Sequence, residues 1–414
     1  MVKTFAAVLL ASSIAGCGNG STPPSPSPAT AVQRMHARPA YNLLYSFEGG
    51  NDGRDPHAGP LIKVKGTLYG TTVYGGGPCR ARCFGGTVFA ITPSGNESVL
   101  HSFESSPKDD GKNPRSGLVD VAGTLYGTTV KGGAAPCYCG AVFKVTRSGA
   151  EAVLHSFAGE PDGSGPEYGL LNVGGTVYGT TWSGGTNNYG TVFAITASGQ
   201  ETVVYSFAGS PDGAQPQAAP INVNGTLYGT TTEGGANCGS IGGCGTVFTL
   251  TPSGAEAVLY SFKGGKTDGR NPMQARLLDV NGTLYGTTRY GGKHDRGTVF
   301  SITTAGKETV LHSFGGPADG VLPYGGLRDV NGALYGTTSN GGSVACGVRY
   351  GNVHGCGTVF KITTSGEETV LHSFGNPGDG KYPYAGLINV KGTLYGTATA
   401  GGAKDAGIVF TLSP

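Results

Sequence analysis

The chain has 414 residues and a formal net charge of +2, and only 13% of its residues are charged. This share is about half of that in an ordinary soluble domain, and a nucleic-acid binder would need a clustered basic face, so we expect no nucleic-acid partner. Glycine is abundant, at 77 residues, but the glycines recur at fixed places, which indicates turns rather than low-complexity disorder.

The first 17 residues have the pattern of an export signal. Lys3 precedes an apolar run from Phe5 to Ile14, and Ile14-Ala15-Gly16-Cys17 follows. This segment resembles the lipobox of bacterial lipoproteins, which implies that Cys17 becomes the lipid-bearing N-terminus and that Gly18 favours sorting to the outer membrane. The alternative is an ordinary signal peptide with an incidental cysteine. No run of about 18 apolar residues follows, so no membrane-spanning helix is expected.

Residues 18–40 are rich in proline and serine and have little to pack. We expect a disordered tether there, able to reach roughly 70 Å if extended. The folded domain is then expected over residues 41–414.

Eight further cysteines fall into four local pairs, which predicts four disulfides in an oxidising compartment. Metal binding is the alternative, but no pair has the two-plus-two spacing of a zinc site. The pair that closes the smallest ring encloses one residue, and we expect it to be strained. The pairs are Cys79 with Cys83, Cys137 with Cys139, Cys238 with Cys244, and Cys346 with Cys356.

Seven copies of Leu-Tyr-Gly-Thr-Thr, or of a near relative, divide the chain into units of about fifty residues, the scale of kelch-like propeller blades. The longer intervals all contain a cysteine-bearing segment. The tyrosines of the seven copies are Tyr69, Tyr126, Tyr178, Tyr228, Tyr285, Tyr335 and Tyr395.

Each unit carries four strand signals, which we name A to D, and no helical period competes with them. Two-residue turns of the Asn-Gly type join A to B, and short turns join C to D. In the fifth unit the strands are predicted over Leu277–Val280, Thr283–Thr288, Gly297–Thr303 and Glu308–Phe314.

Seven units of four antiparallel strands predict an all-β, seven-bladed β-propeller. A β-solenoid is the alternative, but its coils are shorter and lack paired hairpins. The last unit stops after strand C, at Gly407–Leu412, and the first element, Leu43–Phe47, is a strand D without predecessors. We therefore predict that the N-terminal strand completes the last blade and closes the ring, which removes an exposed sheet edge.

The A–B and C–D turns share one face of such a propeller and are minimal in every unit. The B–C and D–A loops share the opposite face and carry every insertion and cysteine pair. Function in repeat proteins tends to lie where loops vary over a rigid scaffold, so we expect the site on this loop-rich face. The termini meet on the turn face, so the tether would leave from there and the loop-rich face would point away from the membrane.

Two repeated patterns invite a catalytic or metal-binding interpretation. The D–A loops repeat Asp-Gly-x-x-Pro, which is turn chemistry, although a ring of carboxylates could also gather cations. Strand D carries His-Ser-Phe or Tyr-Ser-Phe, and a position that accepts either ring indicates a hydrogen bond within the blade rather than a general base. We predict no metal and no cofactor. The aspartates are Asp52, Asp110, Asp162, Asp212, Asp268, Asp319 and Asp379, and the rings are Tyr45, His101, His155, Tyr205, Tyr260, His312 and His372.

Residues that break the repeat on the loop-rich face are the candidate ligand-binding residues. Trp182 is the only tryptophan and replaces Val73, Val130 or Thr232 of other units. Exposed aromatics beside polar groups stack on sugars or anchor protein partners, although packing within the loops is the alternative. The remaining candidates are Tyr189, Tyr74, Tyr290, Lys293, His294, Asp295, Arg296, Arg349 and Tyr350, with His354 beside the last two.

The order Leu-Tyr-Gly-Thr-Thr, Gly-Gly, Gly-Thr-Val-Phe resembles the GloVer tandem repeat of "choice-of-anchor" bacterial surface proteins, over about residues 43–412. The resemblance implies a location in the cell envelope and no particular activity. No nucleophile elbow, phosphate loop or metalloprotease motif is present, but propellers can assemble sites from several blades.

We therefore expect an exported, lipid-anchored monomer at the outer membrane or cell surface that binds a protein partner or a glycan. An extracytoplasmic hydrolase or lyase with a site at the mouth of the central channel is one alternative. A purely structural surface protein is the other.

Overall fold

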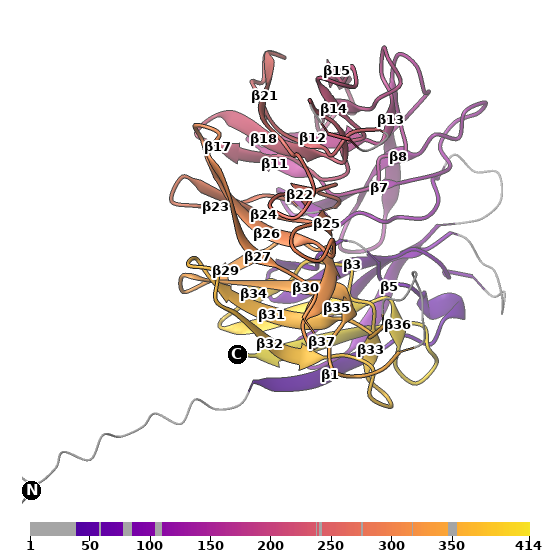
Figure 1. Cartoon of the computed structure of the whole chain (residues 1–414). Helices are drawn as coiled ribbons and strands as arrows, with labels where there is room; N and C mark the ends of the chain where they lie inside the picture. The colour runs from indigo at the N-terminus through magenta and orange to yellow at the C-terminus, as the bar shows by residue number, and fades with distance from the viewer. Residues whose placement is uncertain are drawn as a thin grey trace, which may run out of the picture. The chain divides into compact units, whose positions relative to one another are not determined.

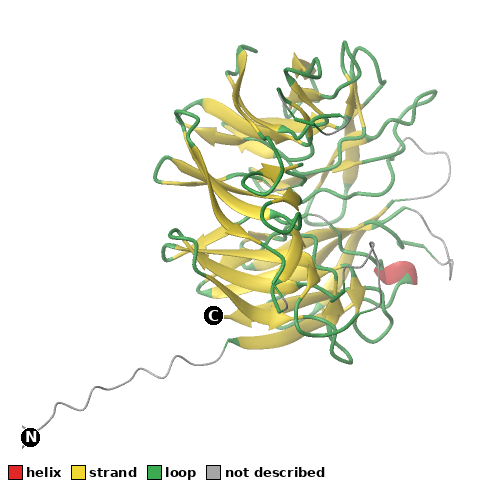
Figure 2. Cartoon of the chain, viewed as in Figure 1, coloured by secondary structure: helices red, strands yellow, loops and turns green. Residues whose placement is uncertain are grey.

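The computed structural model describes residues 39–57, 59–77, 85–103, 110–236, 238–239, 242–274, 276–316, 318–346 and 354–414. They form seven sheets of four principal antiparallel strands, so the predicted seven-bladed propeller is confirmed. Figure 1 shows the blades following one another around the ring, and Figure 2 shows that strands and loops make up nearly all of it. The one helical element of the described residues is the 3-10 turn η1 (Gly50–Asp52).

The innermost strands A are β2 (Ile62–Val64), β6 (Val119–Val121), β11 (Leu171–Val173), β17 (Ile221–Val223), β23 (Leu278–Val280), β29 (Arg328–Val330) and β34 (Ile388–Val390). Strands B are β3 (Thr67–Thr72), β7 (Thr124–Thr129), β12 (Thr176–Thr181), β18 (Thr226–Thr231), β24 (Thr283–Thr288), β30 (Ala333–Gly341) and β35 (Thr393–Ala398).

Strands C are β4 (Thr87–Ile91), β8 (Ala141–Val145), β14 (Thr191–Ile195), β20 (Thr246–Leu250), β26 (Thr298–Thr303), β31 (Thr358–Thr363) and β37 (Ile408–Ser413). Strands D are β1 (Ala40–Ser46), β5 (Glu97–Ser102), β9 (Glu151–Ser156), β15 (Glu201–Ser206), β21 (Glu256–Ser261), β27 (Glu308–Ser313) and β32 (Glu368–Ser373).

Short ribbons link the D–A loop of a blade to its B–C loop on the loop-rich face, so these loops are held by main-chain hydrogen bonds. In the sixth blade, β28 (Gly320–Pro323) pairs with the extended β30. The other pairs are β10 (Gly163–Ser164) with β13 (Ser183–Gly184), β16 (Gly213–Ala214) with β19 (Glu233–Gly234), β22 (Gly269–Arg270) with β25 (Tyr290–Gly291), and β33 (Gly380–Lys381) with β36 (Ala400–Gly401).

The ring closes as predicted. The indigo β1 lies beside the yellow β37 in Figure 1, and the antiparallel register runs from Ala40 opposite Ser413 to Ser46 opposite Ile408. The seventh sheet therefore has the order β1-β37-β35-β34, with strands from both ends of the chain.

The repeated Leu-Tyr-Gly-Thr-Thr is explained by packing between strands B and C. A Cβ added to Gly286 would lie 2.6 Å from Cζ of Phe300, so only glycine admits the aromatic ring of strand C. The last threonine is buried, and Thr288 Oγ1 lies 2.7 Å from Thr298 Oγ1 of strand C. The motif is thus an internal packing element of the blade.

Neighbouring blades meet through an aromatic contact that recurs at every junction. The phenylalanine after each strand D lies edge-on to the strand C phenylalanine of the next blade, as Phe157 does to Phe193, with ring centroids 5.1 Å apart. An edge-to-face pair contributes about 1 kcal/mol beyond the area it buries. The other pairs are Phe47–Phe89, Phe103–Phe143, Phe207–Phe248, Phe262–Phe300, Phe314–Phe360 and Phe374–Phe410.

Candidate functional site

Three of the four predicted disulfides are present among the described residues. They join Cys137 to Cys139, Cys238 to Cys244 and Cys346 to Cys356, with Cα atoms 5.1, 5.7 and 5.3 Å apart. All three lie in B–C loops, as predicted, and they indicate a protein of an oxidising, extracytoplasmic compartment. Cys17, Cys79 and Cys83 lie outside the described residues. Within the described ranges, no helix has the length and hydropathy needed to cross a membrane.

A cavity of about 410 Å³ opens on the loop-rich face and is lined by three successive blades. We call it the face cavity. Two of its walls are the aromatic side chains of Trp182 and Tyr290, which the sequence had marked as candidates. The rest of the lining is polar apart from one methionine, and comprises Glu167, Gln215, Gln217, Thr232, Glu233, Asn271 and Met273.

Trp182 presents a ring that is ready to stack. It follows strand β12 and is 41% exposed, an unusual fraction for the only tryptophan of the chain. Its indole Nε1 donates a hydrogen bond to Oε1 of Gln215, 3.1 Å away on the next blade. Because this bond fixes the ring orientation while leaving much of the ring exposed, Trp182 is preorganised for a planar or apolar ligand surface.

Gln215 owes its position to the backbone of its own D–A loop. Its φ of 56° places its backbone in the left-handed region. Its backbone N–H donates a hydrogen bond to the backbone carbonyl of Tyr189 at 2.8 Å. Its backbone carbonyl accepts a hydrogen bond from the backbone N–H of Thr232 at 3.1 Å. These two backbone hydrogen bonds fix the loop conformation at Gln215, and so they position the side chain that accepts the hydrogen bond from Trp182.

Two arginines contact the ring of Tyr290, the second aromatic residue of the face cavity. The guanidinium groups of Arg270 and Arg289 each lie 4.9 Å from the centroid of its ring. Arg270 in turn donates to both carboxylate oxygens of Asp295, at 3.1 and 2.9 Å. Asp295 was a candidate, and its role is to hold the arginine that contacts Tyr290.

Two carboxyl groups of the face cavity have raised pKa values. Burial raises the pKa of Glu233. Burial also raises the pKa of Glu167, and the charge of Arg115, whose Nη1 lies 3.9 Å from Oε1, opposes but does not cancel the effect. Gln217 adds a buried polar group to the lining, since it is 8% exposed and its Oε1 has no hydrogen-bond partner among the described residues.

The remaining candidates do not line the face cavity as the described residues form it. Tyr189 packs against Gly209, and His294 packs against Gly315. Tyr74 forms an isolated bridge with Arg54 at another blade. Lys293 and Arg296 lie in the turn that contains Asp295, while Arg349 and Tyr350 fall outside the described residues.

Most of the residues that the sequence interpretation missed come from the D–A loops, while Thr232 and Glu233 come from a B–C loop. Gln215 and Asn271 occupy the second variable position of Asp-Gly-x-x-Pro, and Glu167 and Gln217 follow the proline. An alignment of these loops across the seven units shows amides at Asn113, Gln215, Asn271 and Gln217 only, with both positions filled by amides in the fourth loop. The Asp-Gly and Pro of the motif indicate a turn, while its variable positions differ from unit to unit.

The aspartates and rings of the repeat meet at the outer part of each blade junction. The Asp of a D–A loop contacts the His or Tyr of the preceding strand D, and a residue at the start of the next blade's strand D lies beside both. We call these groups the junction clusters. They are Tyr45–Asp52–Glu97, His101–Asp110–Glu151, His155–Asp162–Glu201, Tyr205–Asp212–Glu256, Tyr260–Asp268–Glu308, His312–Asp319–Glu368 and His372–Asp379–Tyr41.

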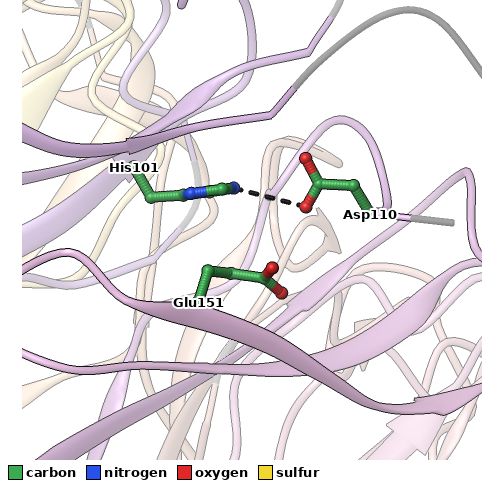
Figure 3. Close-up of side chains that lie close together, drawn as sticks. All are labelled: His101, Asp110 and Glu151. Atoms are coloured by element: carbon green, nitrogen blue, oxygen red, sulfur yellow. Dashed lines mark hydrogen bonds and ion pairs between the residues drawn. The ribbon is translucent and has the colours of Figure 1, made fainter. Parts of the chain in front are cut away.

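Figure 3 shows one junction cluster, in which His101 Nε2 lies 3.3 Å from Asp110 Oδ1 and Glu151 approaches from the next blade. The aspartates also accept backbone hydrogen bonds, as Asp162 does from the amides of Ala158 at 3.0 Å and Gly163 at 2.7 Å. The aspartate is therefore a turn residue, as predicted. The ring is hydrogen-bonded, but its partner lies in the loop that leads to the next blade and not within its own blade.

Three junction clusters contain His, Asp and Glu with ligand atoms all within 4.8 Å of one another, a separation that a divalent cation could bridge. Tyrosine takes the ring position in three other junctions, so the repeat does not require an imidazole there. That no metal is needed stays a prediction.

Burial, followed by the charge of the neighbouring aspartate, raises the pKa of the junction glutamates Glu97, Glu151, Glu201, Glu256, Glu308 and Glu368 to about 7. In each of them Oε1 is buried without a hydrogen-bond partner among the described residues. The uncharged carboxyl is thus the form that the junction accommodates best.

The repeat matches one known family along almost the whole chain. Residues 25–242 and 236–414 match the model of the Gloeobacter/Verrucomicrobia repeat. The chain belongs to this family. The resemblance drawn from the motif is thereby confirmed. No curated protein matches this member of the Gloeobacter/Verrucomicrobia repeat family.

Two solved structures resemble this Gloeobacter/Verrucomicrobia repeat protein at low identity. A gluconolactonase from Xanthomonas campestris is 11% identical, with 90% of this chain and 89% of that chain covered and a TM-score of 0.43. A luciferin-regenerating enzyme is 12% identical, with 91% and 95% covered and a TM-score of 0.41. At these values neither activity transfers to the present chain.

Proposed function

We propose that the protein is a cell-envelope binding protein whose face cavity recognises a glycan. The observation that carries the proposal is Trp182, a 41% exposed indole fixed by Gln215 at the wall of a cavity otherwise lined mainly by amides and carboxyls. Sugars offer apolar C–H faces to an aromatic ring and hydroxyl groups to such amides and carboxyls. A volume of about 410 Å³ has room for a short oligosaccharide segment.

The test is a glycan array with the labelled full-length chain, followed by calorimetric titration of each hit. Trp182→Val restores the residue found at Val73 and Val130, so it should fold normally. We expect it to weaken binding at least about thirtyfold, since aromatic anchors contribute 2 kcal/mol or more.

Tyr189→Ala removes a comparably exposed aromatic outside the face cavity and should leave the affinity within about threefold. Unchanged binding in Trp182→Val would overturn the assignment. Capture of a protein instead of a glycan, lost in the same variant, would retain the site and change the ligand class.

A hydrolase acting in the same cavity is the second candidate, because Glu167 and Glu233 both have raised pKa values there. A raised pKa suits a carboxylic acid that donates a proton to a leaving group. Release of shortened glycan from an array hit, abolished by Glu233→Gln, would favour the enzyme over the binder.

We also propose that Cys17 carries a lipid and that residues 18–40 tether the propeller. Because β1 begins beside the end of β37, the tether would leave from the turn face and the face cavity would point away from the membrane. Labelling with a fatty-acid analogue should be lost in Cys17→Ser and kept when Cys137 and Cys139 are both changed to serine. Persistent labelling of Cys17→Ser would refute the anchor.

A further inference from the structure

The seven innermost strands enclose a central channel with a cavity of about 470 Å³. Its lining comes from all seven blades and shares no residue with the face cavity. Two positions of the repeat recur in the wall. All residues at these positions line the cavity except Leu171. The first residue of strand A is apolar in six blades, and the residue two places before it is Gly, Ala or Pro in six blades. These residues are Ile62, Val119, Leu171, Ile221, Leu278 and Ile388, and Pro60, Gly117, Gly169, Ala219, Gly326 and Gly386.

One arginine breaks each of these patterns. Arg328 takes the apolar position in the sixth blade, and Arg276 takes the small-residue position in the fifth. Both line the channel cavity. The two blades are neighbours, so the two exceptions to a sevenfold pattern put like charges side by side.

Neither charge is neutralised by a carboxylate among the described residues. Arg328 Nε donates to the carbonyl of Leu387 at 3.3 Å, which satisfies one donor but removes no charge. Elsewhere the chain pairs such groups, as Arg115 with Glu167 and Arg270 with Asp295.

Two carboxylates do line the same cavity, but the structure gives them other surroundings. Asp279 is exposed and accepts a hydrogen bond at 2.8 Å from the amide of Gly282, in the A–B turn at the turn-face end. Asp120 belongs to β6 of the second blade, which is not a neighbour of the fifth or sixth.

Arg276 lines the channel cavity and is exposed there to solvent. Burial and, secondly, the positive charge of Arg328 lower the pKa of Arg276 to about 10, and burial lowers the pKa of Arg328. Both guanidinium groups remain charged at neutral pH. Their repulsion is relieved when an anion lies between them.

We propose that the channel is a binding site for a small oxyanion, a carboxylate or phosphate group, held by Arg276 and Arg328. The planar fork of a guanidinium matches the two oxygens of such a group. The cavity leaves room beyond the charged group for a ligand about the size of a monosaccharide or a small organic acid. The site is independent of the glycan proposal.

The test is calorimetric titration of the full-length chain with inorganic phosphate, with D-glucuronate and with uncharged D-glucose. Arg276→Ala and Arg328→Ile each install a residue that another blade already has, at Ala219 and at Ile62, so both variants should fold. We expect binding of phosphate or glucuronate, or of both, and no binding of glucose. Each variant should weaken the anion affinity by at least about tenfold.

Arg147→Ala removes an exposed arginine of the C–D turn on the turn face and should leave anion binding unchanged. Binding of phosphate alone identifies a phosphate site, binding of glucuronate alone a carboxylate site, and binding of both a site that accepts either group. Absence of binding to both anions would overturn the proposal, as would equal affinity in the wild type and both channel variants.

A second readout uses stability. Without anions, removal of either repelling charge should keep or raise the midpoint of thermal unfolding. The bound anion should raise that midpoint in the wild type and not in the variants. The same anion-dependent rise in both variants would place the anion elsewhere and overturn the channel site.

Discussion

The junction clusters repeat the same residues from blade to blade, whereas the channel and the face cavity contain residues that differ between blades. At the junction clusters the same chemistry is repeated around the ring, with Asp in all seven, His or Tyr beside it, and Glu in six. In the face cavity and the channel, single blades depart from the repeat, through Trp182, Arg276 and Arg328. Repetition therefore identifies what holds blade to blade, and departures from it identify where we propose that ligands bind.

The largest effect is expected when a junction loses its aspartate. Asp162→Ala removes the acceptor of two backbone amides and of His155, whose ring nitrogen lies 3.0 Å from Oδ2. Leaving these donors unpaired should lower the free energy of unfolding by about 3 kcal/mol. Chemical denaturation would measure this change, and a loss below about 0.5 kcal/mol would show that the junction does not stabilise the ring.

The next effect is the pH dependence of stability. The folded pKa of the six junction glutamates, about 7, lies above the ordinary value of 4.5. The contribution of these glutamates to the free energy of unfolding is fully present below about pH 4.5 and is lost as the pH rises through about 7. After solvent screening, the total loss is on the order of 2 kcal/mol.

Other junction groups shape the same curve. The hydrogen bond and charge of Asp162 outweigh burial and raise the pKa of His155, which has the same sign as the glutamates. Burial opposes ionisation of Asp162, but the hydrogen bonds from His155, Gly163 and Ala158 together lower its pKa, so its contribution is lost at more acidic pH. The midpoint of thermal unfolding should therefore be highest between about pH 4 and 5. Glu201→Gln should flatten the decline between pH 5 and 8, whereas Glu367→Gln, an exposed control, should not.

A smaller change in the free energy of unfolding is expected when Trp182, a residue of the proposed ligand site, is replaced. Trp182→Val, which is expected to weaken ligand binding at least about thirtyfold, should change the free energy of unfolding by less than about 1 kcal/mol because the ring is substantially exposed. A loss above about 2 kcal/mol would mean that Trp182 packs the loops, the alternative considered for it from the sequence.

The smallest effect is expected when one junction ring replaces the other. His155→Tyr recreates the cluster of Tyr205, whose hydroxyl donates to Asp212 at 3.0 Å. Stability at pH 7 should stay within about 0.5 kcal/mol of the wild type. A large loss would show that imidazole has a role of its own at this position.

The sequence predicted the fold in detail because its signals are local and repeated. The predicted strand Thr283–Thr288 matches β24 at both ends, and the incomplete units at the two ends of the chain predicted the pairing of β1 with β37. The face cavity was harder to foresee, since it joins Trp182 to Gln215 and Tyr290 of the next two blades. Trp182 was visible as the only tryptophan, whereas its partner lay inside a motif that we assigned to turns.

The junction glutamates escaped notice for a different reason. Glu201 lies at the start of strand D and looks like an exposed residue when a single blade is considered. Only the packing of adjacent blades brings it beside Asp162 of the preceding loop. Contacts between repeats depend on how the blades are staggered, which the sequence of one unit does not specify.

Closure of the ring by β1 also determines the order in which the propeller can be completed. Synthesis proceeds from the N-terminus, so β1 is made first of the described strands and its partner β37 last. During that interval β1 has an open edge that can pair with another chain, and closing so long a loop is slow. A growing chain therefore carries β1 without its native partner until the final strand has been made.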